Sequence, residues 1–99
     1  MLDKLQKDDF IPHLHATYRI RLDGIEPIDL ELVSVTELSQ APGPGGRQPF
    51  SLHFLGPVSS KYLVQHIYPL EHPQMGVLTL FIVPLGPEAG RMRYEAIIT

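Results

Sequence analysis

The stretch TYRIRLDGIEPIDLEL, Thr17 to Leu32, decides the fold class because it reads as two β-strands around a turn. Strict alternation of apolar and polar residues is the period-2 signature of a strand with one buried face. Residues 23–27, DGIEP, are rich in turn-forming types. The apolar positions are Tyr18, Ile20 and Leu22 before the turn, and Ile28, Leu30 and Leu32 after it. The sequence therefore predicts an antiparallel hairpin.

The two runs also predict a register for this hairpin. If Leu22 lies opposite Ile28, each apolar residue meets an apolar residue and each arginine meets an acid. Such cross-strand pairs contribute about 0.2–1 kcal/mol each. A slip of one residue would exchange the two faces and destroy both sets of pairs. The expected pairs are Leu22–Ile28, Ile20–Leu30, Tyr18–Leu32, Arg21–Asp29 and Arg19–Glu31.

Four further strands are expected in the rest of the chain. They lie in PFSLHFLGP (49–57), HIYPLEH (66–72), VLTLFIVPL (77–85) and RMRYEAIIT (91–99). Residues 77–85 are apolar on both faces, which is typical of a central strand covered on both sides. The adjacent apolar residues Leu32 and Val33 indicate a β-bulge or a strong bend near residues 32–33. The expected pairs are Leu70–Leu78, Tyr68–Leu80, Ile82–Tyr94 and Leu80–Ala96.

We therefore expect an all-β domain, a six-stranded antiparallel meander that forms a small barrel or a strongly curled sheet. Residues 1–99 suffice for one domain and are too few for two. The N-terminal segment, residues 1–15, is expected to hold a short helix within residues 3–14 that Pro12 ends or kinks. Residues 39–49, SQAPGPGGRQP, are expected to form a flexible connection.

Composition argues against several classes of protein. The net charge is −3, with 8 basic and 11 acidic residues, so we expect no nucleic-acid partner. The absence of cysteine removes disulfides, thiolate nucleophiles and cysteine-based metal sites. The start, MLDKLQKDDF, lacks the apolar core of a signal peptide, and no run reaches the roughly 18 apolar residues of a membrane helix. We expect a cytoplasmic protein without membrane contact.

Histidines are the first candidates for metal or acid–base chemistry. His66 and His72 share a strand face but lie about 20 Å apart at about 3.3 Å per residue, so one metal cannot bind both. We interpret His72 as opening a turn whose backbone its ring bonds. His13 and His15 are close enough to share a metal, with an acid of Asp8–Asp9 as a further ligand. They lack a third ligand at diagnostic spacing, so we predict no metal site and no cofactor.

No catalytic constellation is evident in the sequence. Ser51 and His53 share a strand face about 7 Å apart, but the nucleophile-elbow motif G-x-S-x-G is absent. Residues 43–47, GPGGR, have the composition of a glycine loop without the G-K-[ST] ending that phosphate binding needs. If a pocket exists, we place it near Tyr68 and His72, with His53 as the third candidate residue.

Four phrases between about Asp9 and Ile98 carry a family resemblance: DFIPHL, RQPFSLHFLGP, IYPLEHPQMG and MRYEA. They resemble a family of small bacterial single-domain proteins of unknown function. One departure is His15, where the family pattern would have glycine. The family is associated with gene neighbourhoods of phage-tail-collar-like proteins. The resemblance therefore implies a bacterial origin and a tail-assembly context, and it supplies no catalytic residues.

Two functions from different classes fit these observations. The favoured one is a non-catalytic structural or protein-interaction module, an accessory of a phage-tail-like assembly. Its partner would be another protein or a second copy, because small antiparallel sheets expose edges that must be covered. The alternative is a small-molecule-binding β-barrel or minor enzyme with a pocket near Tyr68 and His72. A histidine that meets an acid would favour the alternative, and a tightly filled apolar interior would disfavour it.

Overall fold

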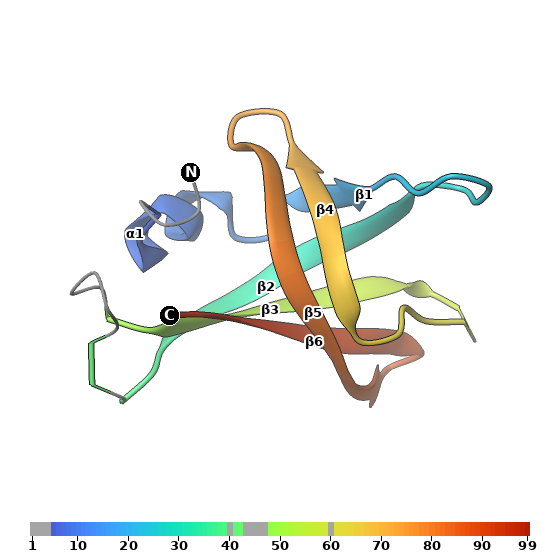
Figure 1. Cartoon of the computed structure of the whole chain (residues 1–99). Coiled ribbons are helices and arrows are strands. Elements are labelled where there is room, and N and C mark those ends of the chain that lie inside the picture. The colour runs from blue at the N-terminus through green and yellow to red at the C-terminus, as the bar shows by residue number, and fades with distance from the viewer. Residues whose placement is uncertain (1–4, 40, 43–47, 60) are drawn as a thin grey trace.

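Six antiparallel strands close into a barrel in the computed structural model of the chain (Figure 1). The structure describes residues 5–39, 41–42, 48–59 and 61–99. The all-β class, the six antiparallel strands and the closure into a barrel are thereby confirmed. Most of the expected 39–49 connection, including GPGGR, lies outside the described residues. The strands are β1 (Thr17–Ile20), β2 (Ile28–Glu37), β3 (Phe50–Val58), β4 (His66–His72), β5 (Gly76–Glu88) and β6 (Arg91–Ile98).

The strand order departs from a meander at one point. Around the barrel it is β1-β2-β3-β6-β5-β4, so β3 is followed in the chain by β4 but pairs with β6. The connection from Val58 to His66 is longer than a tight hairpin allows, and β4 pairs with β1 and β5. In Figure 1, β4 and β5 cross steeply over β2, β3 and β6. The period-2 pattern predicts strands and faces, but it carries no information about which strands become neighbours.

Apolar and aromatic side chains fill the barrel. Alternate residues along the strands point inward and are buried, as the pattern predicts. Tyr18 and Phe54 pack edge to face inside the barrel, with ring centroids 5.6 Å apart. The buried apolar set is Phe10, Tyr18, Ile20, Leu30, Leu32, Phe50, Leu52, Phe54, Leu63, Tyr68, Leu70, Leu78, Leu80, Ile82, Tyr94, Ala96 and Ile98.

The β1–β2 pairing keeps the predicted face but not the predicted register. Tyr18 lies opposite Leu30 instead of Leu32, and Arg19 lies opposite Asp29. This is a displacement of two residues. It leaves apolar beside apolar and basic beside acidic, so the alternation pattern cannot distinguish the two registers.

The loop after β1 accounts for this displacement. β1 ends at Ile20, and residues 21–27 leave the ladder before β2 begins. Arg21, expected opposite Asp29, instead forms an ion pair with Glu71 on β4, with an Nε–Oε1 distance of 3.0 Å. The partner of Arg21 comes from the strand that closes the barrel, and a hairpin considered alone does not contain that strand.

The β4–β5 hairpin has the predicted register, whereas β5–β6 is displaced by two residues. Tyr94 pairs with Pro84 rather than with Ile82. β5 continues to Glu88 and contains an irregularity between Pro84 and Gly86, so its turn into β6 is shorter than the expected loop 86–90. The pairs Tyr68–Leu80 and Leu70–Leu78 are confirmed, and the pairs Ile82–Tyr94 and Leu80–Ala96 are wrong.

The prediction that β5 is covered on both faces is wrong. Leu78, Leu80 and Ile82 point into the barrel and are buried. Val77 and Phe81 point outward and are 57% and 49% exposed. A barrel made by one sheet has a single interior, so no second layer covers the outer face of β5.

The N-terminal helix is present but shorter than expected. It consists of α1 (Lys7–Phe10) and the 3₁₀ turn η2 (Ile11–His13). Pro12 lies in the 3₁₀ turn, where its missing N–H ends the α-helical bonding. Phe10 is fully buried and lies against Phe50, with ring centroids 5.7 Å apart. The segment therefore covers one end of the barrel.

The expected bulge in β2 is confirmed. Leu32 pairs with Phe54 and Ser34 with His53, so Val33 is the extra residue between them. After the extra residue, odd-numbered rather than even-numbered residues of β2 lie on the inward face. This change explains why two apolar residues are adjacent in the sequence at this point.

His15 has a left-handed backbone conformation and links the N-terminal segment to β2 through a backbone hydrogen bond. Its φ is +70°, a region that favours glycine. The His15 N–H donates to the Leu32 carbonyl (2.6 Å), and the Leu32 N–H donates to the Ala16 carbonyl (3.1 Å). The Cβ of His15 therefore lowers the stability of the fold, because it disfavours this backbone conformation.

Comparing His15→Gly with His15→Ala tests this cost, because both variants lose the side-chain contact with Glu31 and differ only in Cβ. The Gly variant should be the more stable by about 1 kcal/mol, since a left-handed residue with a Cβ costs about 1–2 kcal/mol. The free energy of unfolding in urea measures the difference. Equal stability of the two variants would contradict the strain.

Candidate functional site

His72, the last residue of β4, is buried at the end of the barrel with 7% of its surface exposed. Its Nδ1 accepts hydrogen bonds from the backbone N–H groups of Gln74 (3.1 Å) and Met75 (3.2 Å). An accepting Nδ1 requires the neutral imidazole with its proton on Nε2. His72 thus closes the β4–β5 turn through its ring, as predicted.

Two further rings pack against His72. The ring of His13 lies 4.4 Å away and the ring of Tyr18 lies 4.8 Å away, centroid to centroid. The Tyr18 hydroxyl donates to the sulfur of Met75 (3.1 Å), and burial raises the pKa of Tyr18 to about 12. Burial, and secondly the neighbouring His13, hold the pKa of His72 below its usual value of 6.5. His72 is therefore neutral at pH 7.

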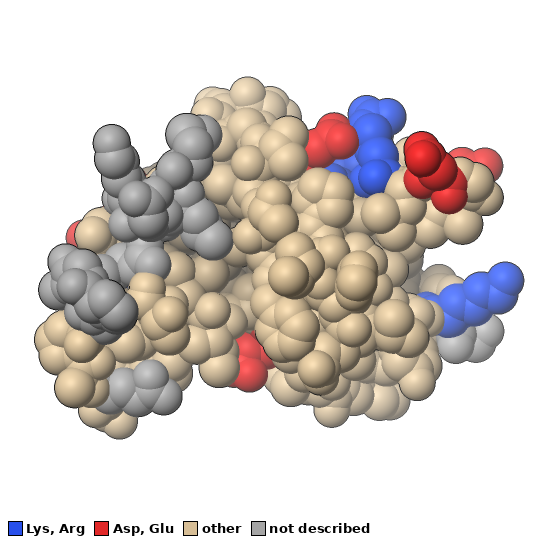
Figure 2. Space-filling view, in the orientation of Figure 1, with Lys and Arg blue, Asp and Glu red and all other residues tan. Residues whose placement is uncertain are grey.

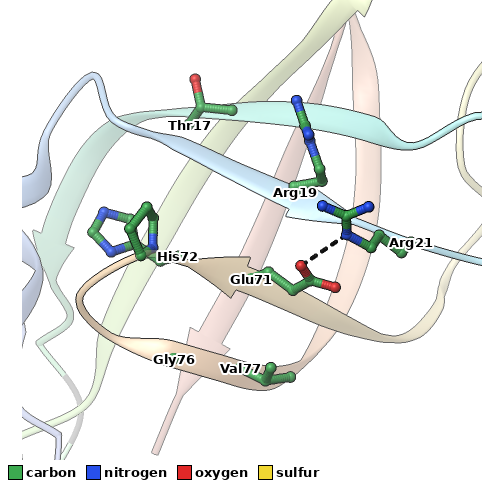
Figure 3. A pocket seen from close by; sticks show the side chains of 8 residues that line it. Thr17, Arg19, Arg21, Glu71, His72, Gly76 and Val77 are labelled. Atoms are coloured by element: carbon green, nitrogen blue, oxygen red, sulfur yellow. Dashed lines mark hydrogen bonds and ion pairs between the residues drawn. The ribbon is translucent and has the colours of Figure 1, made fainter.

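An open depression of about 460 Å³ lies beside His72, where β1 meets β4 (Figure 3). Figure 3 shows the guanidinium groups of Arg19 and Arg21 toward one end and His72 toward the other. Arg19 binds Asp29 (Nε–Oδ1 2.8 Å) and lowers the pKa of that carboxyl, while Arg21 binds Glu71. Both cations of the depression have acidic partners, which leaves little attraction for an anionic ligand.

A polar network covers the outer face of β3 and β6. Glu95 Oε2 accepts hydrogen bonds from the Ser51 hydroxyl (2.9 Å) and from His53 Nε2 (3.0 Å). Arg93 Nη2 donates to His53 Nδ1 (2.8 Å). Because arginine can only donate, His53 is neutral with its proton on Nε2. The bonds from His53 and Ser51 to Glu95 lower the pKa of this carboxyl.

This network contains the residue types of a hydrolytic triad in an order that does not activate a nucleophile. In a triad the histidine lies between serine and acid and takes the serine proton. Here Glu95 lies between Ser51 and His53, and the Ser51 proton is already donated to the carboxylate. The arrangement stabilises the β3–β6 pairing.

The three pocket candidates from the sequence lie in different places. His53 is on the outer face of β3, whereas Tyr68 and His72 point inward from β4. Tyr68 and His72 are about 13 Å apart at about 3.3 Å per residue. The Tyr68 hydroxyl donates to the Val64 carbonyl (2.7 Å). Of the three, only His72 lines the depression.

The histidines considered as metal ligands are also apart. His13 contacts His72, whereas His15 binds Glu31 through Nδ1 (3.1 Å). His66 lies at the start of β4 against the ring of Tyr68. Among the residues that the structure describes, no three His, Cys, Asp or Glu side chains form a group that could hold a metal ion.

Sequence reasoning missed the contact of His13 with His72 and the role of Glu95. The positions of Ser51, His53 and Glu95 on outward faces follow from alternation alone. Their meeting depends on the β3–β6 pairing, and that pairing follows from strand order rather than from any local pattern.

The outer side of β4 and β5 is largely apolar from Ile67 to Thr79 and becomes charged at its end, where Glu71, bound to Arg21, lies opposite Val77. Ile67 and Phe81 are cross-strand partners and are 56% and 49% exposed, and Val77 is 57% exposed. Between them lies the pair Pro69–Thr79. Figure 2 shows a broad area over β4 and β5 without charged side chains, which lie mainly toward the rim of this view. We call Ile67, Pro69, Val77, Thr79 and Phe81 the hairpin face.

A second apolar depression, of about 520 Å³, lies toward the other end of β5. Its lining includes Tyr62, Pro84, Leu85, Pro87 and Met92. Tyr62 and Leu85 are 57% and 50% exposed. Apolar surface therefore occurs toward both ends of the long strand β5.

Comparison with known proteins gives one match, to a family model that spans nearly all of the chain. The model of a domain of unknown function, DUF6916, matches residues 5–98. The chain belongs to the DUF6916 family. No curated protein and no solved structure matches this DUF6916 domain. In the described part of the domain, none of the helices has the length and apolar character needed to span a membrane.

The polar network predicts a pH dependence of stability. The folded pKa of Glu95 lies below the 4.5 of an unperturbed glutamate, so its contribution is present above pH 4.5 and is lost as the pH falls through the folded pKa. Glu95→Gln should lower the free energy of unfolding at pH 7 by about 1 kcal/mol and flatten its fall between pH 5 and 3. Urea denaturation at several pH values measures both effects.

Glu88→Gln is the matched control for Glu95→Gln. Glu88 also contacts Arg93, but at 3.5 Å and with 56% of its side chain exposed. Its removal should change stability by less than about 0.5 kcal/mol. Equal losses in the two variants would contradict the special role of Glu95.

Proposed function

We propose that this DUF6916 domain is a non-catalytic protein-interaction module that binds its partner through the hairpin face. The observation that carries the proposal is the exposure of Ile67, Val77 and Phe81 on one largely apolar side of the barrel, bordered by the Glu71–Arg21 ion pair. Contiguous apolar surface on a small domain marks an interaction site more often than chance exposure does. Phe81, which pairs with Ile67 at one end of this face, is of a residue type that is enriched in protein interfaces.

The chemistry of the hairpin face favours a protein partner. Its side chains offer no ion pair and few hydrogen bonds, so affinity must come from apolar area. A partner with a matching uncharged apolar patch satisfies this requirement. A second copy of the domain has such a patch, because an uncharged apolar face is complementary to itself.

Binding through a strand edge receives less support. The sheet closes on itself through β1 and β4 at the pair Arg19–Glu71, so neither strand is the fully open edge that first suggested self-association. Pro69 lies within β4, the strand at this seam, and has no N–H to offer an added strand. The proposed contact is therefore made by side chains of the face.

The alternative, a small-molecule-binding barrel or minor enzyme, has weaker support. Its favourable observations are the depression beside His72 and the contact of His53 with Glu95, a histidine–acid pair of the kind that favours this alternative. Against it, Arg19 and Arg21 there have acidic partners, and the described inward side chains are apolar or aromatic. The hydroxyl groups of Tyr18 and Tyr68 are also engaged, with Met75 and Val64.

We further propose that the domain is bacterial, is located in the cytoplasm and belongs to a phage-tail-like assembly. This proposal rests on the resemblance carried by phrases such as PFSLHF and YPLEHP. A structural accessory of such an assembly needs a stable fold and a binding face, and no catalytic group. The expected partner is then a structural protein of the assembly or a second copy of the domain.

A photocrosslinking residue at position 81 tests the proposal. Replacing Phe81 by p-benzoylphenylalanine should give a discrete crosslinked product, either with itself in purified protein or with a tail-like structural protein co-expressed from the same gene neighbourhood. Ile67→Glu in the same chain should reduce the yield at least about tenfold, because burying an unpaired charge costs more than 1.4 kcal/mol.

Position 36 is the control. Thr36 is exposed on β2, which lies opposite β5 in the order of strands around the barrel. The same photoreactive residue there should give no discrete product, and Thr36→Glu should leave the crosslink from position 81 unchanged. The absence of any discrete product from position 81 with either partner would refute the proposal.

A further inference from the structure

His13 and His72 join two parts of the chain that are distant in sequence. His13 belongs to η2 in the N-terminal segment, and His72 ends β4. Their rings meet edge to face with centroids 4.4 Å apart. Both groups titrate near neutral pH in unperturbed form, so their contact is sensitive to protons in a range where other side chains are not.

The hydrogen bonds of His72 are compatible with only one protonation state. Its Nδ1 accepts from the N–H groups of Gln74 and Met75. In the protonated ring both nitrogens are donors, so a proton on Nδ1 would face two further donors. Protonation must therefore break both bonds of the β4–β5 turn and place a charge against His13.

The groups around His72 offer this charge little compensation. Residues 73–77 of the turn and the start of β5, PQMGV, contain no ionisable side chain. Tyr18 presents its ring, which is a weak partner for a cation. Two ionisable groups face His72: His13 from η2 and Tyr18 from β1. Three charged groups line its depression: Arg19 from β1, Arg21 from the loop after β1, and Glu71 from β4, which is bound to Arg21.

We propose that the His13–His72 contact is a proton-operated latch whose protonation releases the N-terminal segment, residues 7–15, from the end of the barrel. A helix of four residues has no stability of its own and remains folded only while it is docked. Its other contacts include Phe10 against Phe50, Lys7 with Glu37, the His15 N–H on the Leu32 carbonyl and the exposed His15 ring on Glu31. Release would open the end of the barrel where Phe10 now covers Phe50.

The direction of the pH effect follows from the environment of His72. Burial and the neighbouring His13 hold its pKa in the closed state below 6.5. Release would remove His13 and uncover part of the ring, which weakens both causes. The open state then binds protons more readily, so the latch is closed above about pH 6.5 and opens as the pH falls below it. One proton changes the opening constant by at most about tenfold per pH unit.

Hydrogen exchange of the full chain tests the latch. The reporters are the amides of His15 and Ala16, which donate to Leu32 and His13. After correction for intrinsic rates, their opening constants should rise about tenfold between pH 7.5 and 5.0. Amides of the β3–β6 ladder should remain unchanged, which distinguishes local release from global unfolding.

Two variants separate the latch from other pH effects. His72→Asn keeps an acceptor near the position of Nδ1 and cannot titrate, so its His15 and Ala16 amides should exchange without pH dependence.

His13→Phe keeps a ring against His72 and removes the neighbouring charge, so its opening should shift to lower pH. Since His13 is only partly buried, this variant tests the latch even if His72→Asn does not fold. Wild-type exchange that is independent of pH, an unchanged midpoint in His13→Phe, or full pH dependence in His72→Asn would overturn the proposal.

Discussion

The closure of the sheet between β1 and β4 is the constraint on which the rest of the structure depends. The ladder between these strands contains a single pair, Arg19 with Glu71, and the Arg21–Glu71 ion pair extends the contact. Closure assigns one side of every strand to a common interior. In each strand, the residues that point inward must therefore lie beside inward-pointing residues of the neighbouring strands. The bulge at Val33 keeps the inward-pointing residues of β2 beside those of β3.

Closure also determines how the remaining surfaces are used. The N-terminal segment covers one end of the barrel with Phe10, while the outer polar groups of β3 and β6 bind one another around Glu95. The hairpin face has no such partners, and Phe81 remains half exposed there although it lies in the most apolar run of the chain. A stable scaffold whose described buried polar groups have partners and which exposes an apolar face suits the interaction module that we propose.

Most of the errors in the predicted structure have one physical origin. Displacing Tyr18 from Leu32 to Leu30, or Tyr94 from Ile82 to Pro84, preserves the inward face, so alternation cannot detect a slip of two residues. The inward-facing core was predictable because parity alone determines it. The site was less predictable: the turn-closing role of His72 followed from the His-Pro pair, but its contact with His13 spans most of the chain.

By itself, the sequence determined the all-β class, the faces of the strands, the bulge at Val33 and the turn at His72. These features are local, because they depend on a residue and its neighbours within one strand or one turn. Only the tertiary structure decided the strand order, the exposure of Phe81, the network around Glu95 and the seating of His13 on His72. Each of these requires knowing which distant segments become neighbours, and that depends on how one sheet closes around a single interior.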